Sequence, residues 1–404
     1  MPSAPATVVG AQRRLRAAMF LSSFDRFTIP PLLVAIHRDL GVSLGAAAAV
    51  ASAYFITYGV AQPVWGALSD RLGRVTVLRI AVAGGGVSCL VAATAQYFGV
   101  LVAARALAGL CFAAVVPTGI TFVGDTVEDL AERQHALALL MASMTAGISV
   151  ATVAAGVAAE LLSWRVAFAA SAALAGAVSI VLRGLPEPRR AAQQGTFAER
   201  MRAIGAERWV GVVVAIGFVE GAVIFGSLTF VAASLESAGV GAALAGSAAG
   251  GFGIANVLAT PLVTRAIPRV ASPLLIGGGA TLAAAGLLLA AVESSVVTAL
   301  VATLALGAGF GFLHTTMQTW ATQVIPEARA VTVSLFAASI FVGASVASAV
   351  AAPLADAQRF SLIFLLAAAG AALLALAGPL LRARYLETAG ARGVVGARDV
   401  TPAL

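Results

Sequence analysis

The sequence predicts an all-α polytopic membrane protein, with 12 transmembrane helices arranged as two six-helix pseudo-symmetric bundles. Three observations lead to this fold class. First, 60% of the 404 residues are hydrophobic and only 11% are charged, whereas soluble domains carry about a quarter charged residues. Second, apolar stretches long enough to cross a bilayer, which takes roughly 20 residues, recur along the whole chain. Third, one polar segment near the middle separates these stretches into two groups of six.

Twelve stretches have the length and the hydropathy of a transmembrane helix. They cover residues 16–36, 46–67, 75–95, 98–122, 135–161, 165–184, 209–233, 241–263, 273–292, 295–320, 329–352 and 358–381. We favour helices because these stretches are continuously apolar, while the strands of a membrane barrel alternate in polarity and run about 10 residues. Glycine and alanine are frequent in them, and such small residues let helix backbones approach closely in lipid.

The arginines predict the orientation. All 25 basic residues are arginines, and 20 of them fall in the termini or in segments that we place on the cytoplasmic side. Only Arg38, Arg165 and Arg359 fall in segments on the opposite side. Because basic loops stay in the cytoplasm, both termini are predicted to be cytoplasmic, in a bacterial-type inner membrane. The net charge of +7 follows from this topology, so we expect no nucleic-acid partner.

The polar segment 184–208 predicts a cytoplasmic linker between an N-terminal bundle, residues 1–183, and a C-terminal bundle with a short tail, residues 209–404. The two bundles resemble each other. The stretch from Tyr58, YGVAQPVWGALSDRLGRV, aligns with the stretch from Phe252, FGIANVLATPLVTRAIPRV, at an offset of 194 residues. Repeated membrane bundles commonly hold a substrate near the midplane between the repeats and rock around it, so the predicted function is transport.

The segment between the second and third helices carries the most specific motif. It reads Gly66-Ala67-Leu68-Ser69-Asp70-Arg71-Leu72-Gly73-Arg74. This segment resembles the G-x-L-x-D-R-x-G-R loop of the major facilitator superfamily in every specified position, and the resemblance extends over essentially the whole chain. We expect a close helix contact at Gly66 and a turn at Gly73, because glycine permits both.

The same resemblance implies a cytoplasmic gate formed by the motif residues Gly66, Asp70, Arg71, Gly73 and Arg74 together with Asp125. In this gate Arg74 pairs with Asp125. Asp70 meets the N-terminal end of the eleventh helix, whose partial positive charge favours a carboxylate. The alternative interpretation is that these charges are solvated and only determine the topology.

Two further motifs bear on the family. Arg105 and Gly109, in LVAARALAGL, are similar to the R-x-x-x-G motif of the fourth helix, and Pro117, Asp125 and Arg133 resemble the segment that follows it. Among subfamilies, the chain is most similar to the twelve-helix drug:proton antiporters. Their fifth helix carries G-P-x-x-G-G before a W-R pair; here Trp164-Arg165 is present, but only the last glycine of the element, Gly156, survives in 151–156.

Ionisable residues within the predicted helices are few, and such residues are functional candidates because their burial in a bilayer costs several kcal/mol. We predict Asp25, Glu220 and Arg105 as the proton-coupling groups, since burial favours a protonated carboxyl and a nearby arginine favours the carboxylate. The offset of 194 makes Asp25 and Glu220 near-symmetric. The alternative is a permanent pair of Asp25 with Arg105 or with Arg26 that only holds helices together.

The predicted substrate cavity combines aromatic side chains with a few polar groups. Its candidate residues are Arg26, Tyr58, Gln62, Phe112, His314, Gln318 and Phe341. Apolar walls with few hydrogen-bonding groups suit an amphipathic organic molecule better than a sugar. His314 has three possible roles, which are proton relay, substrate contact or satisfied core histidine.

Together these features predict a proton-coupled secondary transporter that exports a small amphipathic compound or drug by alternating access. The alternative is an importer or uniporter of a small metabolite. We expect a monomer whose partners are a small-molecule substrate, protons and the lipid bilayer. The proton gradient is the expected driving force, and no cofactor or metal is expected. No nucleophile motif, metal-ligand cluster or phosphate loop in the sequence indicates an enzyme.

Overall fold

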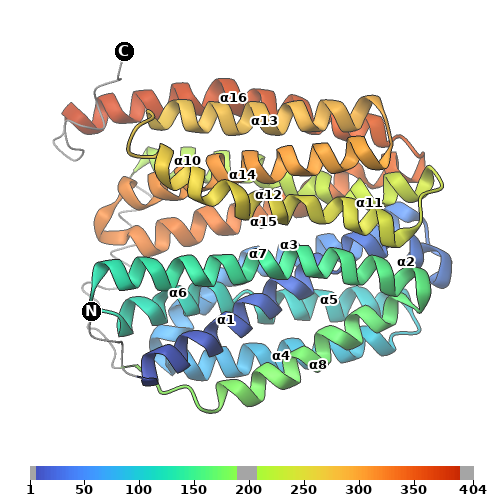
Figure 1. Ribbon diagram of the computed structural model, residues 1–404, viewed down its shortest axis with the longest axis horizontal. Coiled ribbons are helices and arrows are strands. Elements are labelled where there is room, and N and C mark those ends of the chain that lie inside the picture. Colours follow the sequence, from blue (N-terminus) through green and yellow to red (C-terminus); the bar gives the residue numbers. More distant parts are fainter. Residues whose placement is uncertain (1–5, 189–206, 392–404) are drawn as a thin grey trace.

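A computed structural model describes residues 6–188 and 207–391 of the chain, and within them the fold is helical (Figure 1). Twelve helical spans in this part of the chain are long and apolar enough to cross a membrane. Each predicted stretch corresponds to one of these spans, so the predicted fold class is confirmed. The helices lie nearly side by side along the long axis of the molecule.

The first six spans precede the linker. Their helical elements are α1 (Ala6–Phe27), η1 (Pro30–Leu32) and α2 (Leu33–Leu40) in the first span, then α3 (Leu44–Leu72), α4 (Arg74–Thr94), α5 (Phe98–Phe112) with α6 (Val115–Thr126) in the fourth span, α7 (Leu130–Leu161) and α8 (Trp164–Leu182). We refer to these elements as the first half.

The last six spans follow the linker. Their elements are α10 (Arg208–Gly221), the π-helical segment η2 (Ala222–Gly226) and α11 (Ser227–Ser237) in one span, then α12 (Ala242–Ala266), α13 (Ser272–Val292), α14 (Val296–Val324), η3 (Pro326–Ala328), α15 (Arg329–Asp356) and α16 (Phe360–Ala391). We refer to these elements as the second half. Most of the linker predicted at 184–208 and the end of the C-terminal tail lie outside the described residues, and the domain bounds stay a prediction.

The fourth span has a turn at residues 113–114 between α5 and α6, and two further spans also depart from the single continuous α-helices that the sequence predicts. The first span breaks after Phe27 because Pro30 and Pro31 remove backbone donors that an α-helix needs, and a 3₁₀ turn replaces it there. The seventh span widens into the π-helical segment η2 directly after Gly221. Single π turns of this kind occur frequently at functional sites. Both irregularities follow closely on a buried charged residue, Arg26 in α1 and Glu220 in α10.

The two ends of the helical bundle differ. One end holds the starts of α1 and α10 and the ends of α8 and α16; we call it the linker end, and it lies on the left in Figure 1. The other end holds the short connections 41–43, 95–97, 162–163, 238–241, 293–295 and 357–359, and we call it the short-loop end.

Contacts between the halves run from the short-loop end to the middle of the helices. There α3 packs on α15, and α7 packs on α12. Glycines allow the two halves to approach each other closely. A side chain at Gly156 would collide with the backbone of Ala242, and one at Gly59 would lie 2.7 Å from the carbonyl oxygen of Ala338. The one glycine that survives in the predicted element of the fifth helix, Gly156, is therefore a contact point between the halves.

Candidate functional site

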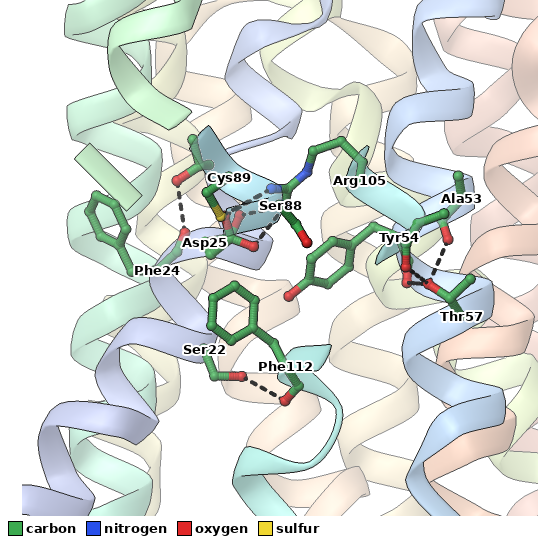
Figure 2. A network of polar contacts seen from close by, with 12 residues as sticks. Ser22, Phe24, Asp25, Ala53, Tyr54, Thr57, Ser88, Cys89, Arg105 and Phe112 are labelled. Carbon is green, nitrogen blue, oxygen red and sulfur yellow. Dashed lines mark hydrogen bonds and ion pairs between the residues drawn. The ribbon is translucent and has the colours of Figure 1, made fainter. Parts of the chain in front are cut away.

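Asp25 and Arg105 form a fully buried ion pair inside the first half. The guanidinium of Arg105, on α5, donates to both carboxylate oxygens of Asp25, on α1, at 2.7 and 2.9 Å (Figure 2). Both side chains have no exposed surface. Cys89 of α4 adds a third contact, because its thiol donates to Asp25 Oδ1 at 3.1 Å. Such bidentate pairing is the strong form of an ion pair, and it ties three helices together at one point.

Two aromatic rings enclose the guanidinium of Arg105. Its central carbon lies 4.8 Å from the ring centre of Tyr54 and 4.8 Å from that of Phe168. Gly109 makes this possible, because a side chain there would collide with the backbone of Tyr54, so α3 and α5 could not approach. The rings stabilise the cation by cation–π attraction, which is worth about 2 kcal/mol when desolvated. Arg105 therefore keeps favourable contacts even when Asp25 is neutral.

Arg26, the residue next to Asp25, lies in a different environment. Its guanidinium carbon is 4.9 Å from the ring centres of both Tyr58 and Phe341, and 5.3 Å from that of Phe27. Because Phe341 belongs to α15 of the second half, Arg26 lies at the boundary between the halves. Among the described residues no carboxylate lies within ion-pair distance of it, so the alternative pair of Asp25 with Arg26 is not formed.

Glu220 and His314 form a partly buried polar contact within the second half. The Nδ1 atom of His314, on α14, lies 2.9 Å from Oε1 of Glu220, on α10. Glu220 is fully buried, and its second carboxylate oxygen has no hydrogen-bond partner. The imidazole stacks between Phe310 and Phe336, with ring centres 4.5 and 5.6 Å away. The contact gives one imidazole nitrogen a partner, and the three roles considered for His314, which are proton relay, substrate contact and satisfied core histidine, stay predictions.

The predicted coupling residues therefore do not form one cluster. Asp25 and Arg105 are brought together, whereas Glu220 contacts His314 and not Arg105. At the offset of 194 residues the counterpart of Glu220 is Arg26. The pseudo-symmetry thus relates a buried acid of one half to a buried base of the other.

The predicted cavity residues fall into separate places. Tyr58 and Phe341 gather around Arg26, with their ring centres 4.5 Å apart. Phe112 lies elsewhere: its side chain is buried against Gly85 inside the first half, away from the boundary. Gln62 is buried and Gln318 half-buried, and neither side chain makes a hydrogen bond within the described part of the chain.

The loop motif forms the Arg74–Asp125 pair that the resemblance implies, together with two contacts that it does not imply. Arg74 pairs with Asp125 at 3.1 Å and also with Asp70, and it donates to Ser69 at 2.7 Å. Gly73 has a φ of 101°, which favours glycine, so the expected turn is present there. Glu187 was not predicted: its carboxylate accepts a hydrogen bond from the backbone of Val75 at 3.1 Å, at the start of α4.

The expectations for Gly66, Arg71 and Asp70 are not confirmed. A side chain at Gly66 would meet none of the described atoms within 4 Å, so the expected close helix contact is not present there among the described residues. Arg71 is exposed. The expected approach of Asp70 to the start of α15 stays a prediction, because the side chains of residues 327 and 330 lie outside the description.

Sequence reasoning missed two acids that join the halves at the short-loop end. Glu160, near the end of α7, accepts a hydrogen bond at 2.7 Å from the backbone N–H of Ala243, at the start of α12. Asp356, the last residue of α15, accepts one at 2.5 Å from Gly45, at the start of α3, and another at 3.0 Å from Ser43. We call these contacts the carboxylate latches. Their acids stand 196 residues apart, a spacing near the repeat offset that would have revealed them.

The Trp164-Arg165 pair also has a structural role at the short-loop end. Both side chains donate to Asp39, the indole at 3.0 Å and the guanidinium at 2.5 Å, and Arg165 stacks on Trp164. This contact holds α8 against α2 within the first half. It is separate from the buried ion pair.

The first half thus holds a buried acid–base pair, the second half holds an acid–histidine pair, and aromatic rings lie at the boundary between the halves. Over residues 16–348 the sequence matches the Major Facilitator Superfamily. The chain belongs to this superfamily.

Relatives of this major facilitator include resistance proteins. It is 28% identical over 204 residues to the puromycin resistance protein of Streptomyces alboniger, covering 50% of this chain and 41% of the relative. It is 32% identical over 165 residues to multidrug resistance protein D of Escherichia coli, covering 39% and 40%. The chain thus spans about two fifths of the length of these curated relatives.

Solved structures of other transporters share the fold of this major facilitator. A nucleoside transporter superimposes with a TM-score of 0.76 at 15% identity, covering 92% of this chain and 99% of that one. A bacterial homologue of the human lysosomal transporter Spinster, in an inward-facing and unoccupied conformation, gives a TM-score of 0.76 at 17% identity, covering 94% and 98%. At these identities the likeness concerns the fold alone.

Proposed function

We propose that this transporter is proton-coupled and exports a small amphipathic organic compound or drug by alternating access. The observation that carries the proposal is the fully buried pair of Asp25 and Arg105 on two different helices. An acid inside a membrane protein can be protonated and neutral, or ionised and paired with an arginine. It therefore has two discrete states. Proton uptake and release can then be linked to a change in helix packing.

The environment of the pair supports a reversible change. Protonation of Asp25 would remove the charge that Arg105 neutralises, and the carboxyl group would no longer compensate the cation. Tyr54 and Phe168 would still enclose the guanidinium, so the cost of separating the pair is reduced. Proton binding at Asp25 can therefore loosen α1 from α5 without leaving Arg105 in a purely apolar site.

Glu220 with His314 serves as the second titrating group. Histidine is the side chain whose charge changes most readily near neutral pH, and its acid partner lies 2.9 Å away. A proton shared between the two groups would alter the charge next to the aromatic boundary. This assignment adds His314 to the coupling residues expected from sequence.

Export is favoured over import by the relatives, several of which are named for resistance or efflux. A proton moving down ~100 mV supplies roughly 2.3 kcal/mol, enough for close to a fifty-fold gradient of a neutral substrate at one proton per cycle. We place the protein as a monomer in the cytoplasmic membrane with the linker end inside. Labelling of a single cysteine introduced at position 195 by an impermeant external thiol reagent in intact cells would contradict this orientation.

The direct test of the function uses inside-out vesicles that contain the full chain. Candidate compounds are first ranked by thermal stabilisation of the purified protein. An acidic vesicle lumen should then drive uptake of a stabilising compound, and a protonophore should abolish that uptake. Accumulation that persists after the gradient collapses would exclude proton exchange.

The alternative is an importer or uniporter of a small metabolite, which the altered element of the fifth helix favours. Of that element only Gly156 is retained. The two functions differ in vesicles of known orientation. An importer accumulates its substrate in right-side-out vesicles under an inward proton gradient, and a uniporter equilibrates it without accumulation.

A further inference from the structure

We propose that Arg26 binds the acidic group of the transported substrate, which is therefore an amphiphilic organic anion with a carboxylate, sulfonate or phosphate group on an aromatic body. The inference rests on the proposed transport function and adds the chemical class of the substrate. Its basis is the difference between the two buried arginines of the first half, Arg26 and Arg105.

Arg26 is a buried cation without a buried anion. Only 4% of its surface is exposed. Asp25 is its neighbour in sequence, but both carboxylate oxygens of Asp25 accept hydrogen bonds from Arg105. Glu220, the buried acid at the equivalent position of the other half, contacts His314. Within residues 6–188 and 207–391 no acid is left to pair with Arg26.

The hydrogen-bonding groups of Arg26 are also largely unused. Its one hydrogen bond in the described structure goes to the hydroxyl of Ser23, at 3.3 Å. The Nε atom is buried and has no partner. A buried charge is normally paired and a buried donor is normally satisfied, because each omission costs free energy. A guanidinium with free donors in a fixed fork matches the two oxygens of a carboxylate or the oxygens of a phosphate.

The place of Arg26 is where a transported molecule has to bind. Its guanidinium lies against both Tyr58 of the first half and Phe341 of the second half, whose rings also contact each other. Substrates of repeated bundles bind between the repeats near the midplane. A ligand that binds Arg26 therefore touches both halves and can respond to their relative movement.

The surroundings of Arg26 suit an aromatic body. Phe341 stacks on Phe225 with ring centres 5.9 Å apart, and Phe225 contacts Phe310 at 5.3 Å. Phe310 in turn stacks on His314. These rings form a continuous apolar wall from the cation of the first half to the acid of the second half. A flat apolar ligand can lie against this wall while its acidic group meets Arg26.

The linker end of α1 carries a basic cavity on the same helix. A cavity of about 420 Å³ lies between α1 and α7, and its lining includes Arg13, Arg16 and Ser143 but no acid. A second cavity shares both arginines and adds Glu132. Arg16 and Ser23 stand two helical turns apart, so they lie on the same side of α1. The positive charge of this cavity attracts anions to the linker end of the helix that holds Arg26.

The test measures binding of three matched probes to the purified full-length protein by calorimetry. The probes are 2-naphthoate, its neutral isostere 2-naphthamide, and the cation 2-naphthylmethylammonium. In the parent, naphthoate should bind at least about tenfold more tightly than naphthamide, because a charged hydrogen-bonded pair is added. The cation should bind most weakly. Equal affinity of naphthoate and naphthamide, or no binding of naphthoate up to its solubility limit, would overturn the proposal.

Variants assign the preference to Arg26. Arg26→Gln should weaken naphthoate by about tenfold or more and leave naphthamide within about threefold, while Arg26→Lys should keep part of the preference. Arg359→Gln is the matched control, since Arg359 is exposed. A preference for naphthoate that persists in Arg26→Gln would contradict the assignment. If Arg26→Gln does not fold, the parent and Arg26→Lys still decide the outcome.

Two further comparisons separate related explanations. In the first, phosphatidylglycerol is added as a competitor. If it abolishes the higher affinity for naphthoate over naphthamide, Arg26 binds a lipid headgroup and the proposal of a soluble anion is wrong. Binding is measured without any proton gradient. The binding result is therefore independent of the vesicle experiment. A failure of proton coupling would not contradict anion binding, and a failure of anion binding would not contradict proton coupling.

Discussion

The carboxylate of Asp356 accepts a hydrogen bond from the backbone N–H of Gly45 at 2.5 Å, so the end of α15 in the second half meets the start of α3 in the first half. Glu160 of the first half makes the equivalent contact with Ala243 of the second half. In both, a carboxylate lies at the N-terminus of a helix, where the helix dipole favours negative charge. The two carboxylate latches join the halves reciprocally at the short-loop end.

The first prediction is that the latches stabilise the closed short-loop end. The double change Glu160→Gln with Asp356→Asn removes both charges and retains similar shapes. The loss of about 1 kcal/mol should shift the equilibrium towards opening roughly fivefold. Labelling of Ser52→Cys, at the seam where Ser345 bonds the Ser52 carbonyl at 2.8 Å, reports the opening. The control is Glu293→Gln, an exposed acid at the same end. Unchanged labelling would show that the latches do not control closure.

The second prediction concerns Asp25. Asp25→Asn leaves the buried Arg105 without its countercharge, and breaking a buried pair in this way costs about 3–5 kcal/mol. We expect a lower thermal unfolding temperature and loss of gradient-driven transport, with some substrate binding or exchange retained. Asp25→Glu, which keeps the charge, is the matched comparison. Normal uphill transport by folded Asp25→Asn would place the coupling elsewhere.

The third prediction concerns Glu220 and His314. If the two side chains share a proton during transport, transport by the parent should depend on pH, and His314→Asn should flatten that dependence because it removes the imidazole that contacts Glu220. Glu220→Gln should reduce proton-linked flux. His135→Asn, at an exposed histidine, controls for the loss of any histidine. If the pH dependence of transport is unaltered in His314→Asn, this histidine serves only in packing.

The fourth prediction concerns the loop motif. Arg74→Ala removes contacts with Asp70, Asp125 and Ser69, which tie α3, α4 and α6 together at the linker end. Because Asp70 is partly exposed, the loss should be about 1 kcal/mol. Asp70→Asn removes one of the charges. Both variants should slow transport severalfold and leave substrate affinity nearly unchanged. Arg71→Ala should have little effect on transport. If Arg74→Ala transports at the parental rate, the motif only determines the topology.

Hydropathy was sufficient to predict the twelve spans, because every apolar stretch of the right length must form its own backbone hydrogen bonds in lipid. The motif was sufficient for the Arg74–Asp125 contact, because its residues are close in sequence or follow a known pattern. Neither source predicts the π-helical segment η2, since its residues are as apolar as any other part of the span.

The partners of the buried charges were decided by the tertiary structure. The sequence by itself placed Asp25, Arg26, Arg105 and Glu220 within membrane spans, but it left open whether Asp25 pairs with Arg26 or Arg105. Neighbours on a helix point in different directions, so the position of α5 in the first half brought Arg105 to Asp25, and Arg26 came to lie at the boundary of the halves. Packing of α14 likewise brought His314 to Glu220. Hydropathy determines which segments enter the bilayer, whereas the direction of each side chain there depends on how the helices pack.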